Sequence, residues 1–117
     1  MITVHSFTPV YFGEKRSVEI GILHDKDRRL AEAMLARATD LPHRQIERNM
    51  PYGPEDGVTH SLKIHAQTLG LPNVMLEVRN DLLRTAEDQR AMAREVKMLV
   101  EPALAGLGLI AEGAARA

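Results

Sequence analysis

The sequence predicts an α/β fold, a fragment of a mixed, mainly parallel sheet with flanking helices. Residues 18–23 alternate along the chain, with Ile20 and Ile22 on one face, as in a strand. Residues 27–38 carry an apolar stripe at helical spacing, and residues 73–78 form an apolar run typical of a buried strand. Strand, helix and strand with short connections predict a parallel pair joined by a right-handed crossover.

The elements on either side of this core follow from local signals. Thr3 and Val4 form the remnant of a first strand, and residues 8–17 form a loop. Asp25 or Asp27 can accept hydrogen bonds from the first turn of the helix over 27–38.

The middle of the chain is rich in turn residues. Residues 40–44 predict a turn, residues 45–47 a short extended piece, and residues 49–57 an irregular loop that contains two Pro and two Gly. Thr59 is the predicted cap of a short helix that ends at Gly70.

A long amphipathic helix follows the last strand, with Asn80 and Asp81 as its expected caps. Pro102 predicts a kink or a break in this helix, because proline removes a hydrogen bond and clashes with the preceding turn. We therefore expect one domain over residues 1–107 and a frayed tail over 108–117.

Composition places the 117-residue chain among ordinary globular proteins, with 44% apolar and 26% charged residues. The net charge of −1 gives no reason to expect nucleic acid or an anionic membrane as a partner. The start of the chain shows no secretory signal, so we expect a cytoplasmic protein. The absence of cysteine leaves His, Asp and Glu as the metal ligands to expect.

Two ionisable residues lie within or just past short apolar runs that are typical of buried strands. His5 lies just past the first run, and Glu77 lies within the last one. Open α/β proteins build sites from such strand ends. The alternatives are a surface histidine and an exposed Glu77–Arg79 pair; a buried Glu77 would instead need a partner or a raised pKa.

The other histidines favour structural roles. His60 and His65 are five residues apart, which does not place two ligands on one helical face. His24 and His43 lie in predicted turns, where a solvated or hydrogen-bonded surface histidine is the ordinary outcome.

Two further groups could contact a small ligand. Asn49 and Tyr52 lie in a loop restricted by Pro51, although a packed tyrosine in an ordinary turn explains them equally. Arg28 could bind a carboxylate, or it could lie on a solvated helix face after the cap.

Taken in order, five segments resemble the C-terminal portion of the N-formylglutamate amidohydrolase family, over residues 3–105. The segments are His5-Ser6-Phe7-Thr8-Pro9, residues 20–30, Asn49-x-Pro51-Tyr52, residues 56–65 and residues 71–79.

The resemblance implies a zinc-carboxypeptidase-like fold with one zinc ion at the carboxyl edge of the sheet. It makes His5 the last of three zinc ligands and Glu77 the residue that activates water. It assigns Asn49, Tyr52 and Arg79 to the substrate or the surroundings of the site, and Arg28 to a substrate carboxylate. In the family the first two ligands come from a long upstream segment, whereas four residues precede His5 here. The resemblance therefore implies that the domain over residues 1–107 is an incomplete amidohydrolase-like unit.

Three functions are consistent with these residues and with the resemblance. The first is a zinc-dependent amidohydrolase that converts N-formyl-L-glutamate and water to formate and glutamate. The second is a non-catalytic remnant, or one half of a split enzyme, which would self-associate or bind a missing N-terminal half through an exposed apolar face. The third is a binding module, which explains the Asn49 loop but not the pair of strand residues.

Overall fold

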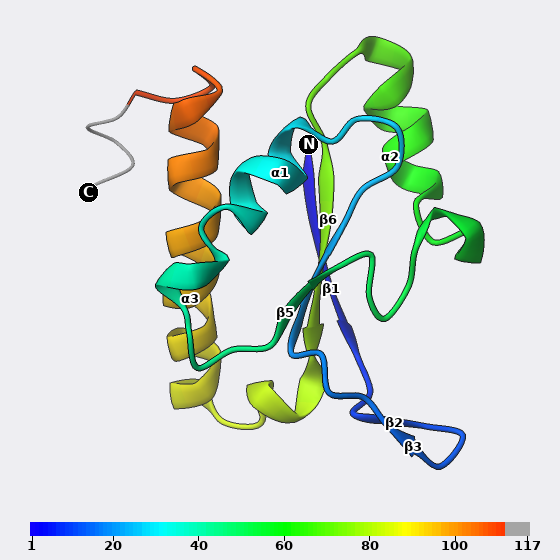
Figure 1. The fold of residues 1–117 in the computed structure, drawn as a ribbon, viewed down its shortest axis with the longest axis vertical. Helices are drawn as coiled ribbons and strands as arrows, with labels where there is room; N and C mark the ends of the chain where they lie inside the picture. Colours follow the sequence, from blue (N-terminus) through cyan, green and yellow to red (C-terminus); the bar gives the residue numbers. More distant parts are fainter. Residues whose placement is uncertain (112–117) are drawn as a thin grey trace.

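A four-stranded sheet forms the centre of the molecule (Figure 1). The computed structural model describes residues 1–111. The sheet order is β1-β6-β4-β5, with strands Ile2–Phe7 (β1), Val74–Arg79 (β6), Ile20–Leu23 (β4) and Ile46–Arg48 (β5). Helices α1 (Arg29–Leu35) and α3 (Ala86–Gly106) cover one face, and α2 (His60–His65) lies on the other.

The predicted α/β class is confirmed, with a mixed and mostly parallel sheet. β1 is parallel to β6, and β4 is parallel to β5, to which α1 connects it. β4 and β6 are antiparallel, so the parallel pairing predicted for residues 18–23 and 73–78 is wrong. The connection through α1 places the short strand β5 beside β4 and parallel to it. β6 lies on the other side of β4 and runs in the opposite direction. A zinc-carboxypeptidase-like fold stays a prediction.

The main core lies between the sheet and the α1–α3 layer. Ile22 of β4, Leu76 of β6, Met34 of α1 and Leu99 of α3 are each fully buried in it. β6 is buried from Val74 to Val78 because it lies between β1 and β4 and has helices on both faces.

The first two helices are shorter than predicted. α1 spans seven residues, and Asp27 Oδ1 accepts from the backbone N–H of Arg29, its first residue, at 3.0 Å, although the N-cap position itself is Arg28. The helix predicted up to Gly70 divides into α2 and a 3₁₀ turn over Gln67–Leu69 (η3). Thr59 does not cap α2, because its hydroxyl donates to Asp25 Oδ2 at 2.9 Å.

Helix α3 begins later than predicted and continues further. Asn80–Leu83 forms a 3₁₀ turn (η4), and the cap is Thr85, whose Oγ1 accepts from the N–H of Asp88 at 3.0 Å. The helix passes through Pro102 to Gly106, so the predicted break does not occur. None of the helices in the described part of the chain is long and apolar enough to span a membrane.

The predicted loop over 8–17 contains a small hairpin of β2 (Val10–Tyr11) and β3 (Glu14–Lys15). Phe12 and Gly13 make its turn, both with positive φ, and the hairpin projects from the end of the sheet (Figure 1). The remaining short elements are 3₁₀ turns at Ala38–Asp40 (η1) and Pro54–Asp56 (η2). Of the predicted frayed tail, residues 112–117 lie outside the described part.

Candidate functional site

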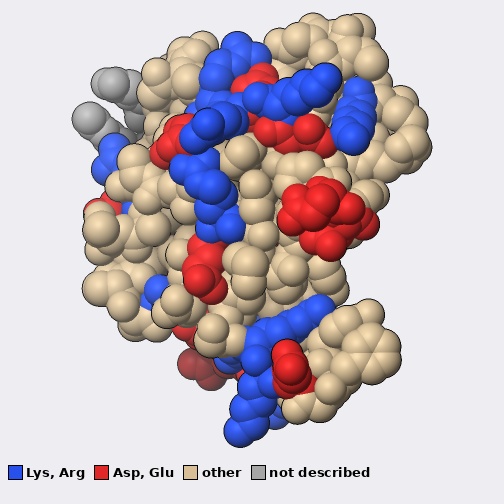
Figure 2. Space-filling model, turned by 45° about the vertical axis from the view of Figure 1, so that its right-hand side comes forward, with Lys and Arg blue, Asp and Glu red and all other residues tan. Residues whose placement is uncertain are grey.

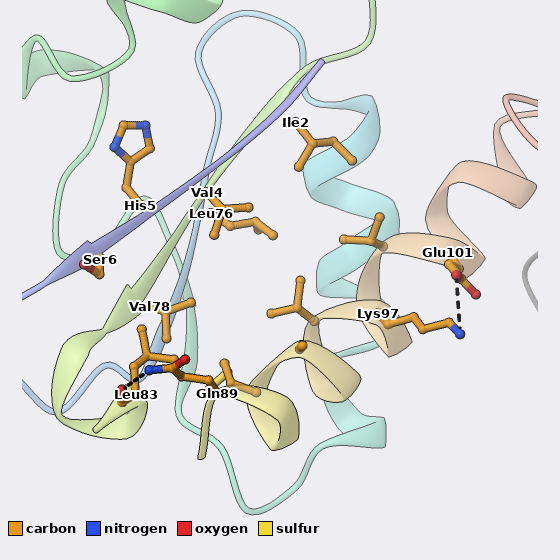
Figure 3. A pocket seen from close by; sticks show the side chains of 14 residues that line it. Ile2, Val4, His5, Ser6, Leu76, Val78, Leu83, Gln89, Lys97 and Glu101 are labelled. Carbon is orange, nitrogen blue, oxygen red and sulfur yellow. Dashed lines mark hydrogen bonds and ion pairs between the residues drawn. The ribbon is translucent and has the colours of Figure 1, made fainter. Parts of the chain in front are cut away.

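His5 and Glu77 occupy partnered positions on adjacent strands. They are register partners in the parallel pairing of β1 with β6. Side chains at such positions point to the same face of a sheet. Figure 3 shows His5 pointing away from α3, so the two residues share the face that carries α2. The structure therefore brings together the two residues on which the sequence prediction depends.

Glu77 is a buried carboxylate with incomplete hydrogen bonding. It is 5% exposed, and its Oε2 atom has no hydrogen-bond partner. Burial raises the pKa of Glu77, and the electrostatic interactions of its carboxyl group with His5 and Arg16 lower this pKa by less than burial raises it. A carboxylate in this state is a stronger base than an exposed one, which is the property of a general base.

Arg16 is a functional candidate that the sequence prediction missed. It lies after the hairpin, where its Nη2 donates to the Tyr52 hydroxyl at 3.2 Å and its Nη1 donates to the Thr8 carbonyl at 3.1 Å. Its guanidinium carbon lies 5.5 Å from the centre of the Phe7 ring and 5.2 Å from that of Tyr52. A half-buried cation held by aromatic rings beside Glu77 suits an anionic ligand. No sequence signal joins Arg16 to Tyr52, because 36 residues separate them.

Tyr52 reaches this group through a loop that crosses β4. Gly21 is the β4 partner of Glu77, and a Cβ atom at Gly21 would overlap the carbonyl oxygen of Met50. Glycine at this position therefore lets the loop pass directly over the strand. The result is a site built from β1, the end of the hairpin, β6 and the Tyr52 loop.

Arg79 lies at the end of β6 but does not pair with Glu77. Its Nε donates to Asp81 Oδ1 at 2.7 Å, and its Nη1 donates to the backbone carbonyl of Arg16 at 2.8 Å. Arg79 thus holds the backbone from which the Arg16 side chain extends. The structure places it as a residue that positions Arg16.

The side chain and the backbone N–H of Asn49 both bind the backbone of the chain. Its Oδ1 accepts from the backbone N–H of His24 at 2.9 Å, and its own N–H donates to the Ile22 carbonyl at 3.0 Å. Its φ of 50° is one that asparagine tolerates better than most residues. Asn49 therefore fixes the start of the loop that carries Tyr52.

Arg28 lies at the start of α1 in a group of paired charges. Its Nη2 is 2.8 Å from Glu32 Oε1, and Arg48 binds the same oxygen at 2.6 Å. These two arginines lower the pKa of Glu32 to about 2. Figure 2 shows Lys and Arg side chains beside Asp and Glu on the face that it presents. The guanidinium of Arg28 is thus already bound to a carboxylate of the chain itself.

One histidine differs from its prediction. His24 is only 8% exposed, with Nδ1 2.8 Å from the Asp25 carbonyl oxygen and Nε2 3.0 Å from Arg48 Nη1. Because arginine can only donate, Nε2 accepts and Nδ1 carries the proton. His43 contacts Glu95, and His60 and His65 are exposed on α2.

The described residues do not complete a zinc site. Within residues 1–111 no three side chains of the types His, Cys, Asp and Glu lie together as a metal-binding group. Catalytic zinc needs three protein ligands. The zinc ion therefore stays a prediction, and His5 and Glu77 alone do not fit it.

Comparison with known proteins identifies a similar solved structure. The chain matches no family model and no curated protein sequence. It is similar to the crystal structure of gene product Atu2144 from Agrobacterium tumefaciens, with 53% identity and a TM-score of 0.86. The match covers 92% of this chain and 43% of that chain, so this chain spans less than half of the Agrobacterium protein.

Proposed function

We propose that the chain belongs to a zinc-dependent amidohydrolase that removes formyl from an N-formyl amino acid such as N-formyl-L-glutamate. The observation that carries this proposal is Glu77, a buried carboxylate of raised pKa that lies in register with His5. The Oε2 atom of Glu77 is buried without a hydrogen-bond partner, which is costly and which a purely structural role of the pair does not explain. The family resemblance supplies the reaction and the substrate class.

In this reaction Glu77 takes a proton from the attacking water and returns it to the leaving amine. Arg16 is the residue that we assign to the substrate carboxylate, since it is a half-buried cation beside Glu77 and Tyr52 holds it in place. Arg28, the earlier candidate, is bound to Glu32. Arg79 acts indirectly, through the backbone of Arg16.

A second candidate follows from the incomplete ligand set. The chain would then be one half of a split enzyme, or a non-catalytic remnant, and a partner would supply the other ligands. The absence of a three-residue metal group within residues 1–111 favours this candidate. Within residues 1–111 the side chains present do not by themselves fit a catalytic zinc ion.

Hydrolysis and metal content test the first candidate together. The first candidate predicts that the purified chain releases formate from N-formyl-L-glutamate when zinc is present, and that Glu77→Gln lowers kcat at least about 100-fold, as for the loss of a general base. Glu14→Gln is the matched control, because Glu14 is an exposed carboxylate on the hairpin and the chemical change is the same.

Two results would contradict parts of the proposal. Equal loss of activity in Glu77→Gln and Glu14→Gln would remove Glu77 as the base. A chain that neither binds zinc in stoichiometric amount nor releases formate would exclude activity of the chain by itself and favour the split-enzyme candidate.

A further inference from the structure

An open apolar groove lies between the edge strand β1 and helix α3. Its volume is about 850 Å³, compared with about 270 and 290 Å³ for two other recesses of the surface. We call it the β1–α3 groove, and its apolar lining includes Ile2, Val4, Leu76, Val78, Met92 and Val96. Figure 3 shows the labelled apolar residues of β1 and β6 on the side of the sheet that faces α3, whereas His5 points to the opposite side.

Three of the polar side chains that line the groove, Gln89, Lys97 and Glu101, contact other groups of the chain. Lys97 Nζ lies 3.8 Å from Glu101 Oε1, and Gln89 Nε2 donates to the Leu83 carbonyl at 3.0 Å. Val4, in contrast, is 63% exposed. A hollow apolar surface of this kind is typical of an interaction site.

The adjoining strand adds a second feature. β1 is an edge strand, since β6 is its only sheet neighbour within the described residues. Its six residues contain no proline, and its pairing with β6 is continuous from Ile2 to Phe7. Edges of this type accept a further strand through their free backbone groups.

The length of the Agrobacterium protein bears on what could occupy the groove. The match covers 92% of this chain but only 43% of the Agrobacterium chain. The other 57% of the Agrobacterium chain (100 − 43) therefore lies outside the match. Such a remainder is longer than this chain and is therefore large enough to cover a face of the shared part. The β1–α3 groove combines a large apolar hollow with an open strand edge, which the two smaller recesses do not offer.

We propose that the β1 edge and the β1–α3 groove bind a separate polypeptide equivalent to that remainder, which adds a strand to β1 and places an apolar helix in the groove. A second copy of this chain fits less well, because a two-fold contact brings one concave groove against another. This proposal rests on the split-enzyme candidate in one respect, because both require that the chain bind a polypeptide partner. Its readout is binding, so a failure of hydrolysis leaves it standing.

The test is co-expression of this chain with the part of the Agrobacterium protein that lies outside the match. We expect a 1:1 complex by affinity capture and light scattering. Val4→Asp should weaken it at least about tenfold, because it places a charge in the apolar groove. Leu69→Asp, at a site that is 71% exposed and outside the groove lining, should leave the affinity unchanged.

Three results would overturn the proposal: no complex, equal weakening by both variants, or a dimer of the chain alone that Val4→Asp dissociates. If the second chain does not accumulate alone, the two are joined by a flexible linker and amide exchange is measured. We then expect the outer amides of β1 to exchange more slowly in the fusion than in the isolated chain. Equal exchange in the two proteins would refute the proposed pairing.

Discussion

The two halves of the sheet are completed to different degrees. On the β4–β5 side, α1 and α3 close the core over Ile22, and Leu99 is fully buried there. On the β1 side, the same helix α3 stands apart from the strand, and Val4 is largely exposed in the groove. Helix α3 thus packs closely over the β4–β5 side of the sheet and borders an open groove on the β1 side.

Charged groups follow the same division. Arg44 joins the loop before β5 to α3 through Glu95 at 2.7 Å and to the approach of β4 through Glu19 at 3.0 Å. All three side chains are less than one-fifth exposed. On the β1 side, the buried oxygen of Glu77 has no hydrogen-bond partner. The closed half therefore holds its charges in pairs, and the β1 half holds the candidate site.

The largest effect should come from a cavity in the closed half. Leu99→Ala removes a fully buried side chain from the main core, and we expect a loss of about 3 kcal/mol in the free energy of unfolding. Val4→Ala, on the open flank, should cost less than about 0.5 kcal/mol, because its side chain already contacts water. Urea denaturation of both variants measures the difference. Similar losses would show that the groove is closed in solution.

A smaller effect should come from the ion pairs of the same half. Arg44→Ala leaves Glu19 and Glu95 without their shared partner in a mostly buried position, which we expect to cost about 2 kcal/mol. His43→Ala is the control, since His43 contacts the other oxygen of Glu95 but is 57% exposed. It should cost less than about 0.5 kcal/mol. A loss of stability in Arg44→Ala no greater than that in His43→Ala would show that the pairs contribute nothing.

Elements with strong local signals could be predicted from the sequence. The apolar run of β6, the stripe of α3 and the Asp27 contact at the start of α1 each depend on near neighbours in the chain. The direction of β4 against β6 could not, because the chain between them contains α1, β5 and α2, and each can reverse its course.

The same difference between local signals and long-range contacts explains which residues of the candidate site could be predicted. His5 and Glu77 were visible because each interrupts or follows an apolar run, and the register of β1 with β6 places them together. Arg16 was missed because its neighbours Phe7 and Tyr52 come from other elements. Arg79 and Asn49 were visible as polar residues, but their backbone contacts depend on the folded loops.

The smallest effect, and the one that tests the β1 half, is the pH dependence caused by Glu77. Its pKa is raised above the ordinary value of 4.5, so the folded protein holds this proton more tightly than the unfolded chain does. The resulting stabilisation is fully present below pH 4.5 and is lost as the pH rises through the raised pKa. Glu77→Gln cannot ionise and should lack this dependence.

We therefore expect the stability of Glu77→Gln relative to the native chain to increase by about 1 kcal/mol between pH 4 and pH 8, the magnitude for one buried polar group without a partner. Thermal unfolding of both proteins over this range measures it, with Glu14→Gln as the control that should follow the native chain. A difference that does not vary with pH would mean that Glu77 ionises as freely as an exposed carboxylate. The β1 half would then lack the base on which the proposed reaction depends.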